Sequence, residues 1–392
     1  MRMSYVYTIL GFMALIVLHE AGHFLAAKAT GMRVERFSLF FGKPLVSFRR
    51  GETEYGIGWL PAGGYVKITG MNPQDELALE DELRELRAGG SEQRIAAVQA
   101  ELDEIRRRAY YNQAVWKRVV VILAGPFMNL LIAFGVLFAI FASHRIYVYD
   151  SHGQPVISRT VGAVERGAPA AGRLKPGDVI VAVDGRRVRS FSQVERLIDA
   201  HRCAGAPVAG CRARTPVRLE VDRRGRLLTL AIRPVYDATL KRMVVGFEFA
   251  QQTRQLGLAA AAGHSFTQIG SVTAKTVSAI GRIFEPRERK QLHGVVGVVA
   301  ITSQEFSFST VDALGTLALI SLSLAIVNLF PFLPLDGGHV FWALAEKVRG
   351  RRISFQTMER AGMVGFALII VLFAIGLSND ISALTGNGFN IR

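Results

Sequence analysis

Two histidines and a glutamate, His19, Glu20 and His23, lie inside the first hydrophobic stretch of the chain, in the sequence LIVLHEAGHFLAA. An ionisable side chain at membrane depth costs at least about 2.5 kcal/mol, so it persists mainly where it pairs, lines a cavity or binds an ion. Positions i and i+4 share one face of a helix, so both imidazoles can bind one metal. Glu20 can then hold and deprotonate a metal-bound water. The pattern favours a catalytic metal over a buried polar pair that only stabilises helix packing.

A catalytic zinc usually has a third protein ligand and an open position for water. The best candidate is Asp336, in NLFPFLPLDGGHVF (328–341). Two prolines break the helix before Asp336, and the two glycines after it allow a tight turn. Unwound backbone at membrane depth must face protein or a wet cavity. His339 is a rival ligand, but we expect it to pack or to hydrogen-bond beside the site.

These residues need membrane helices to position them. Half of the 392 residues are hydrophobic, and four apolar stretches have the length or nearly the length of a membrane span. The predicted order is a first span (1–30), a cytoplasmic region with a β element and amphipathic helices (31–117), a second span (118–142), a periplasmic α+β domain (150–249), a linker with an amphipathic helix at the membrane surface (250–312), a third span (313–340), a cytoplasmic turn (341–361), a fourth span (362–378) and a periplasmic tail (379–392).

Loop charge sets the predicted orientation. Residues 31–117 and the short turn before the fourth span are rich in Lys and Arg, which places them in the cytoplasm and both termini outside. The first and third spans then run in the same direction, so His19 and Asp336 both lie towards the cytoplasmic face. A cleaved signal peptide is the alternative for the first stretch, but its hydrophobic segment has no reason to carry His, Glu and His.

The net charge of +15 is compatible with nucleic-acid binding. However, the basic residues are scattered and lack aromatic interleaving or a recognised binding motif. Basic cytoplasmic loops and anionic lipid explain the charge instead, so we expect lipid contact and no nucleic acid.

Several segments outside the spans have local signatures. Residues 51–70 contain Tyr, Ile, Trp and Val among Gly and Pro, which predicts one or two short strands with a turn near Pro61 to Gly64. Residues 74–110 predict two charged helices broken at Gly89 and Gly90. Leu256 to Phe284 is too polar for a span and fits an amphipathic helix at the membrane surface.

The α+β domain contains both cysteines, Cys203 and Cys211, in the short loop CAGAPVAGC. An oxidising compartment would permit a disulfide there. A metal pair is the alternative, but the usual ligand spacing and nearby histidines are lacking.

Taken together, the motifs HEAGH (19–23), GPFMN (125–129) and NLFPFLPLDGG (328–338) resemble the site-2 proteases, in particular the bacterial RseP-like intramembrane zinc metalloproteases. The stretch LKPGDVIVAVDGRRVRSFSQV (174–194) is similar to a bacterial PDZ domain. The resemblance implies a polytopic α-helical protein of the bacterial inner membrane with four transmembrane helices, a membrane-associated β element and a periplasmic α+β PDZ domain. It also implies that His19, His23 and Asp336 bind Zn²⁺ and that Glu20 is the general base.

The resemblance further implies a single-span membrane protein as substrate, such as an anti-sigma factor already trimmed by another protease. Asn328 would hold the substrate segment, and the β element around Gly56 to Lys67, with Gly63, Gly64 and Tyr65, would pair with it by strand addition. Two features depart from the family pattern: His293 and Val295 replace a Ser and a Pro that are common in relatives, and only one PDZ module fits between the spans.

Two other classes of function compete with a protease. A membrane-anchored PDZ adaptor with a non-catalytic metal site would need the same spans but no general base. A metal transporter would need more intramembrane polar residues along a pathway than this chain shows.

Overall fold

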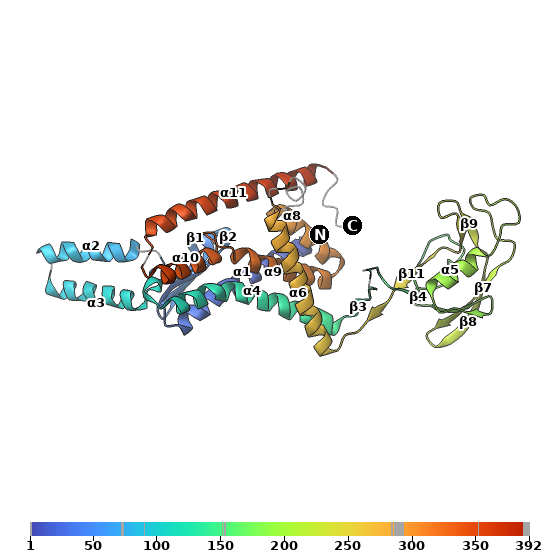
Figure 1. Cartoon of the computed structure of the whole chain (residues 1–392), viewed down its shortest axis with the longest axis horizontal. Coiled ribbons are helices and arrows are strands. Elements are labelled where there is room, and N and C mark those ends of the chain that lie inside the picture. Colours follow the sequence, from blue (N-terminus) through green and yellow to red (C-terminus); the bar gives the residue numbers. More distant parts are fainter. Residues whose placement is uncertain are drawn as a thin grey trace. The chain divides into compact units, whose positions relative to one another are not determined.

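The structure is a computed structural model that describes residues 2–71, 74–89, 91–150, 152, 154–283, 285, 294–351 and 353–386. The chain forms two compact units (Figure 1). The first consists of Met1–Ile140 with Leu258–Arg392, and the second of Phe141–Gly257. Of the stretch Gln291–Val299, which contains the departures from the family pattern, residues 291–293 lie outside the described residues.

Four described helices of the first unit are long and apolar enough to cross a membrane: α1 (Arg2–Ala29), α4 (Val115–Ser143), α9 (Thr310–Asn328) and α11 (Phe355–Thr385). This confirms the predicted number of candidate spans. The unit also contains α6 (Leu258–Gly281), α8 (Val295–Phe308) and α10 (Asp336–Arg349). Helix α6 lies within the stretch Leu256 to Phe284 for which a helix was predicted, while its place at a membrane surface stays a prediction.

The third candidate span differs from the predicted range 313–340. Helix α9 ends at Asn328, and α10 begins at Asp336. Pro331 and Pro334, which lie between the two helices, lack the amide hydrogen that a continuing helix requires. The break therefore places Asp336 in the first turn of a new helix instead of near the end of an unbroken one. Helix α11 extends beyond the predicted range 362–378 at both ends.

The β element is built from two strands that are longer than predicted, β1 (Val34–Arg50) and β2 (Thr53–Ile68). Their register places the segment from Arg36 to Leu39 between two parts of β2, 54–57 on one side and 64–67 on the other. A tight turn at Gly51 joins β1 to β2. Segments 54–57 and 64–67 run in opposite directions on the two sides of β1, so the chain also reverses between them, in the region of the turn predicted near Pro61 to Gly64. Segment 64–67 is thus an outer edge of this sheet among the described residues.

Two charged helices, α2 (Gln74–Gly89) and α3 (Glu92–Arg108), follow the β element and form a hairpin. Leu83, Val98 and Leu102 are buried between them. The short helix η1 (Tyr110–Asn112) then leads into α4. These bounds agree with the two helices predicted from the sequence.

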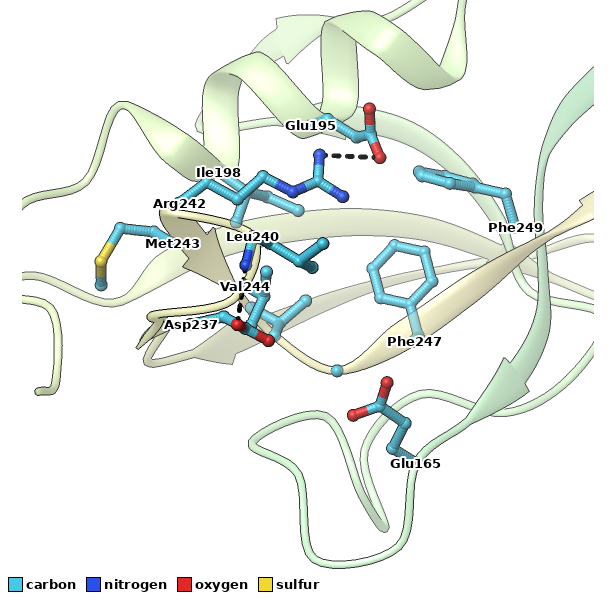
Figure 2. A pocket seen from close by; sticks show the side chains of 12 residues that line it. Glu165, Glu195, Ile198, Asp237, Leu240, Arg242, Met243, Val244, Phe247 and Phe249 are labelled. Atoms are coloured by element: carbon cyan, nitrogen blue, oxygen red, sulfur yellow. Dashed lines mark hydrogen bonds and ion pairs between the residues drawn. The ribbon is translucent and has the colours of Figure 1, made fainter. Parts of the chain in front are cut away.

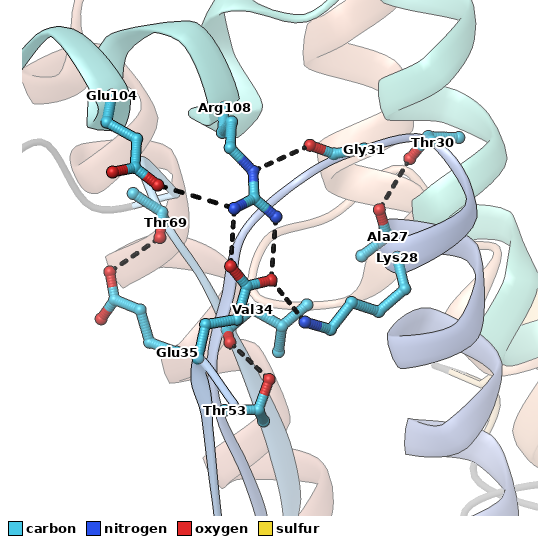
Figure 3. Close-up of polar contacts among 11 residues, drawn as sticks. Ala27, Lys28, Thr30, Gly31, Val34, Glu35, Thr53, Thr69, Glu104 and Arg108 are labelled. Atoms are coloured by element: carbon cyan, nitrogen blue, oxygen red, sulfur yellow. Dashed lines mark hydrogen bonds and ion pairs between the residues drawn. The ribbon is translucent and has the colours of Figure 1, made fainter. Parts of the chain in front are cut away.

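An ion cluster joins the base of this hairpin to α1 and to the β1–β2 turn (Figure 3). Arg108 donates two hydrogen bonds to the Glu52 carboxylate, at 2.6 and 2.8 Å, and Lys28 forms an ion pair with the same group. Arg108 also donates to the Gly31 carbonyl. The Arg108 guanidinium, helped by Lys28, lowers the pKa of Glu52 to about 2.

Replacing Glu52 by glutamine should lower the thermal-unfolding midpoint at neutral pH, and the difference should shrink in acid. The folded pKa of Glu52 lies below the ordinary value of 4.5. Its contribution to stability is therefore complete above pH 4.5 and is lost as the pH falls towards 2. Unfolding midpoints of the parent and Glu52→Gln, compared at pH 7 and pH 3, test this. A difference that is equal at both pH values would contradict it.

The second unit contains a six-stranded sheet with the order β11-β4-β5-β7-β8, and β6 pairs with β5 off this path. Its main strands are β4 (Ile157–Val164), β5 (Val179–Val183), β7 (Val217–Arg223), β8 (Arg226–Ile232) and β11 (Phe247–Gln251). The smaller strands are β3 (Ile146–Tyr147), β6 (Arg186–Arg187), β9 (Val235–Asp237), β10 (Arg242–Val244) and β12 (Thr253–Arg254).

The helix α5 (Phe191–Asp199) packs on this sheet, with Val194 and Ile198 in a buried core that includes Ile180, Val217 and Leu219. The unit is thus an α+β fold, as the alternation of β-rich segments and turns predicts. Cys203 and Cys211 are joined in a disulfide with a Cα–Cα distance of 6.0 Å, which agrees with the disulfide alternative and not with the metal pair.

Candidate metal centre

The structure brings the three predicted ligands together. Nε2 of His19 lies 3.3 Å from Nε2 of His23, and each nitrogen lies 3.4 Å from Oδ2 of Asp336. Both histidines are buried. Two donors bound to a tetrahedral zinc at about 2.0–2.1 Å stand about 3.3–3.4 Å apart, so the spacing fits that ion. Oδ2 of Asp336 is buried without a hydrogen-bond partner among the described residues, which also fits a metal ligand.

Helix α4 orients the second nitrogen of each imidazole. Nδ1 of His23 lies 2.9 Å from the Val121 carbonyl oxygen. A carbonyl can only accept, so Nδ1 carries the proton and Nε2 keeps a lone pair for a metal. The carbonyl therefore selects the tautomer that a metal needs.

Asn129 is fully buried and serves His19. Its amide nitrogen lies 3.0 Å from Nδ1 of His19, while its Oδ1 has no partner among the described residues. The two ends of an amide exchange by a half-turn, and their assignment follows from the hydrogen-bond network. With the amide turned, Oδ1 accepts the proton of Nδ1 and Nε2 of His19 is free for a metal. Neither Val121 nor Asn129 was predicted, although GPFMN marked the segment that ends at Asn129.

Glycines let the helices approach each other at the site. A Cβ atom on Gly125 would lie 2.2 Å from Nε2 of His23, and one on Gly22 would lie 2.4 Å from the Ala124 carbonyl oxygen. Such distances are far below van der Waals contact, so α1 and α4 pack this closely only because both positions lack a side chain.

The loop before α10 is equally tight. A Cβ atom on Gly337 would lie 2.3 Å from the Leu329 carbonyl oxygen, and one on Gly338 would lie 2.5 Å from the Leu333 amide nitrogen. The two glycines that follow Asp336 thus allow the loop to fold back on the start of α10. This packing fixes the position of the carboxylate.

Glu20 lies close enough to all three predicted ligands for their charges to act on its carboxylate. A Cβ atom on Gly64 would lie 2.9 Å from Cγ of Glu20. The outer segment of β2 therefore runs directly beside the predicted general base. This contact places a free sheet edge, Glu20 and the predicted ligands in one site.

The other predicted site residues have more varied positions. Gly63 adjoins Gly64, and Tyr65 stacks on Phe41 and accepts a hydrogen bond from Arg36. Asn328 is half-buried at the last turn of α9, and the structure records no hydrogen bond for its side chain within the described residues. His339 is not among the three grouped donors, in keeping with its predicted place beside the site.

The second unit contains a separate pocket, shown in Figure 2. It lies beside β11, which is the edge strand of the six-stranded sheet, and its lining includes Ile198 of α5, Phe247 and Phe249. Charged side chains also line the pocket. Glu195 forms an ion pair with Arg242 at 2.9 Å, and Glu165 and Asp237 complete the charged part of the lining. An edge strand beside a helix is an arrangement that can accept an extended peptide.

Comparison with known proteins assigns the chain to a family. The model of peptidase family M50 matches residues 7–372. The chain therefore belongs to this family, the site-2 protease family, and is a multi-pass membrane metalloprotease of it.

Curated relatives agree with this assignment. A Brucella suis protein named "Putative zinc metalloprotease" is 27% identical over 94% of this chain and 92% of its own length. A protein of the same description from Mesorhizobium japonicum is 29% identical over 93% of this chain and 95% of its own. "Metalloprotease MmpA" of Caulobacter vibrioides is 29% identical over 94% of this chain and 92% of its own.

Proposed function

We propose that the protein is an intramembrane zinc endopeptidase that cleaves single-span transmembrane proteins in regulated intramembrane proteolysis. The observation that carries the proposal is the triangle of His19, His23 and Asp336 in a membrane protein, with both histidines buried and Glu20 beside them. An anti-sigma factor or a similar signalling protein, already trimmed by another protease, is the proposed substrate. The proposed location is a bacterial inner membrane, with both termini and the α+β domain in the periplasm.

In the proposed mechanism, His19, His23 and Asp336 would hold the zinc, which when bound would supply Lewis-acid chemistry to the site. Glu20 takes the proton of the attacking water and passes it to the leaving amine. Val121 and Asn129 hold the two imidazoles in the tautomers that this arrangement requires.

The outer edge of β2 is the proposed place for the substrate. A helical substrate hides its amides in hydrogen bonds, so the scissile bond becomes accessible only when the segment is extended. Segment 64–67 offers an edge to which such a segment can add as a strand. The contact of Gly64 with Glu20 supports this proposal, because a strand added there would pass close to the base.

For the second unit we propose a PDZ domain. The pocket between α5 and the edge strand β11 supports this assignment. A domain of this kind can grip an extended peptide end or exclude untrimmed substrates by its bulk. Both actions restrict cleavage to proteins that another protease has shortened.

Two variants test the proposed function. Glu20→Gln should keep zinc at the level of the parent but lower the cleavage rate of a reconstituted single-span substrate by at least about 10²-fold, because general-base catalysis contributes this much. Asp336→Ala should lose both zinc and cleavage. Metal analysis and gel assays of the purified proteins measure both quantities.

The outcome also distinguishes the competing class. A PDZ adaptor with a non-catalytic metal would retain its biological function in Glu20→Gln and show no cleavage in the parent. Cleavage that persists in Asp336→Ala would contradict the proposed metal site.

A further inference from the structure

One face of the β element contains a polar cavity that the proposed reaction does not use. The cavity has a volume of about 460 Å³. Residues from both strands and from the segment before β1 line it: Arg33, Glu35, Arg36, Ser47, Phe48, Arg49, Glu54 and Lys67. Four of these carry positive charge and two carry negative charge, so the lining is cationic.

The acidic residues each neutralise one base. Arg36 forms an ion pair with Glu54 at 2.7 Å, and Lys67 forms one with Glu35 at 2.8 Å. The structure records no ion pair or hydrogen bond for the side chains of Arg33 and Arg49 with any described residue. The cavity therefore retains an excess of two positive charges.

Arg33 gives the stronger sign of a missing partner. Its Nε atom is buried and has no hydrogen-bond partner among the described residues. Leaving a buried donor unsatisfied typically costs about 1–3 kcal/mol, and more for a charged group. A ligand that supplies acceptor oxygens would recover this cost, and phosphate oxygens match the guanidinium fork.

The strand that contributes Ser47, Phe48 and Arg49 to the cavity also carries exposed apolar side chains. Phe48, which lines it, is 63% exposed, and Leu45 and Val46 of the same strand are 71% and 67% exposed. Exposed apolar side chains in such a row mark a surface that meets lipid or a partner. A ligand that fits both parts has an anionic head and a hydrocarbon tail.

We propose that this cavity binds the phosphate of an anionic phospholipid headgroup, with its acyl chains along the strip from Leu45 to Phe48. Basic residues close to a membrane attract anionic lipid, and Arg33 and Arg49, which form no ion pair or hydrogen bond with a described residue, supply that attraction here. The bound lipid holds β1 and β2 at the membrane surface, and with them the edge segment 64–67. The proposal rests on the proposed membrane placement of the β element, but not on peptide hydrolysis.

Native mass spectrometry of the purified full chain in neutral detergent tests the site. Phosphatidylglycerol is titrated into the parent, Arg49→Gln and the double variant Arg33→Gln/Arg49→Gln. Each arginine near an anionic lipid contributes about a fivefold gain in affinity, so the single variant should bind about fivefold and the double variant about 25-fold more weakly. Arg49 is exposed, so its replacement leaves the fold intact and decides the result if the double variant fails to fold.

Matched controls separate this site from general charge and from free phosphate. Arg186→Gln/Arg187→Gln removes the same charge from exposed positions in the second unit, and its phosphatidylglycerol affinity should stay within about twofold of the parent. Phosphatidylcholine should bind more weakly than phosphatidylglycerol, and inorganic phosphate alone should displace the lipid only in large excess. Equal losses in the control, no loss in Arg49→Gln, or phosphate that binds as tightly as the lipid would overturn the proposal.

No substrate is present in these measurements, so the lipid site and the protease can fail separately. A parent protein that has normal zinc content and cleavage but binds no phosphatidylglycerol would refute the lipid site alone. Normal lipid binding in a chain that binds no zinc would refute the proposed function alone.

Discussion

Gly125→Ala is expected to remove zinc from the protein and to abolish cleavage. The added Cβ would lie 2.2 Å from Nε2, 2.6 Å from Cε1 and 2.8 Å from Cδ2 of His23, so the whole imidazole must move. A ring that moves away from α4 also loses its hydrogen bond to the Val121 carbonyl. Even changes to residues that only support a ligand lower metal affinity about 10–100-fold. We therefore expect at least a 100-fold loss of zinc affinity when a ligand itself is displaced.

A matched control is available on the same helix. A Cβ atom on Gly135 would meet nothing within 4 Å. Gly135→Ala should therefore bind zinc normally and gain about 1 kcal/mol of helix stability, since alanine favours the helix over glycine. Zinc content after dialysis against a chelator series measures both variants. A Gly125→Ala protein that keeps one zinc under the conditions that the parent tolerates would show that the imidazole is not where the structure places it.

The sequence was sufficient to predict the parts of this site that are local. His19 and His23 stand four residues apart on one helix, so helix geometry alone brings them together. Asp336 could be predicted because prolines and glycines mark a broken helix, which is unusual at membrane depth. Likewise, the four apolar stretches predicted four candidate spans, which the structure contains.

Other parts depend on packing between distant segments. The contacts of Val121 and Asn129 with the imidazoles require that α4 lie against α1, and no local pattern specifies which residues then meet. The fold of the β element was also predicted only in part. Segment 54–57 and segment 64–67 pair with the same part of β1, a register that strand propensity cannot reveal.

An ion pair outside the three motifs holds α10 against α4. Nη2 of Arg118 lies 2.7 Å from Oε2 of Glu346, and the two side chains are only 10% and 13% exposed. The Arg118 guanidinium also lies 5.9 Å from the centre of the Tyr110 ring. Because α10 begins with Asp336, this pair fixes the helix that carries the third predicted ligand.

Glu346→Ala is therefore expected to destabilise the protein by about 3–5 kcal/mol, because it leaves the Arg118 charge buried without a partner. Zinc affinity should fall as well, since α10 is no longer anchored. The double variant Arg118→Met/Glu346→Leu removes both charges and should recover most of the lost stability. Such a recovery is the sign of a buried pair, because an exposed pair contributes little to stability in the first place. Lys347→Ala, at the neighbouring exposed position, is the control and should change stability by less than about 0.5 kcal/mol. Unfolding midpoints in detergent and zinc content measure both effects. If Glu346→Ala behaves like Lys347→Ala, the ion pair does not position Asp336. In that case the packing of the loop around Gly337 and Gly338 holds Asp336 alone.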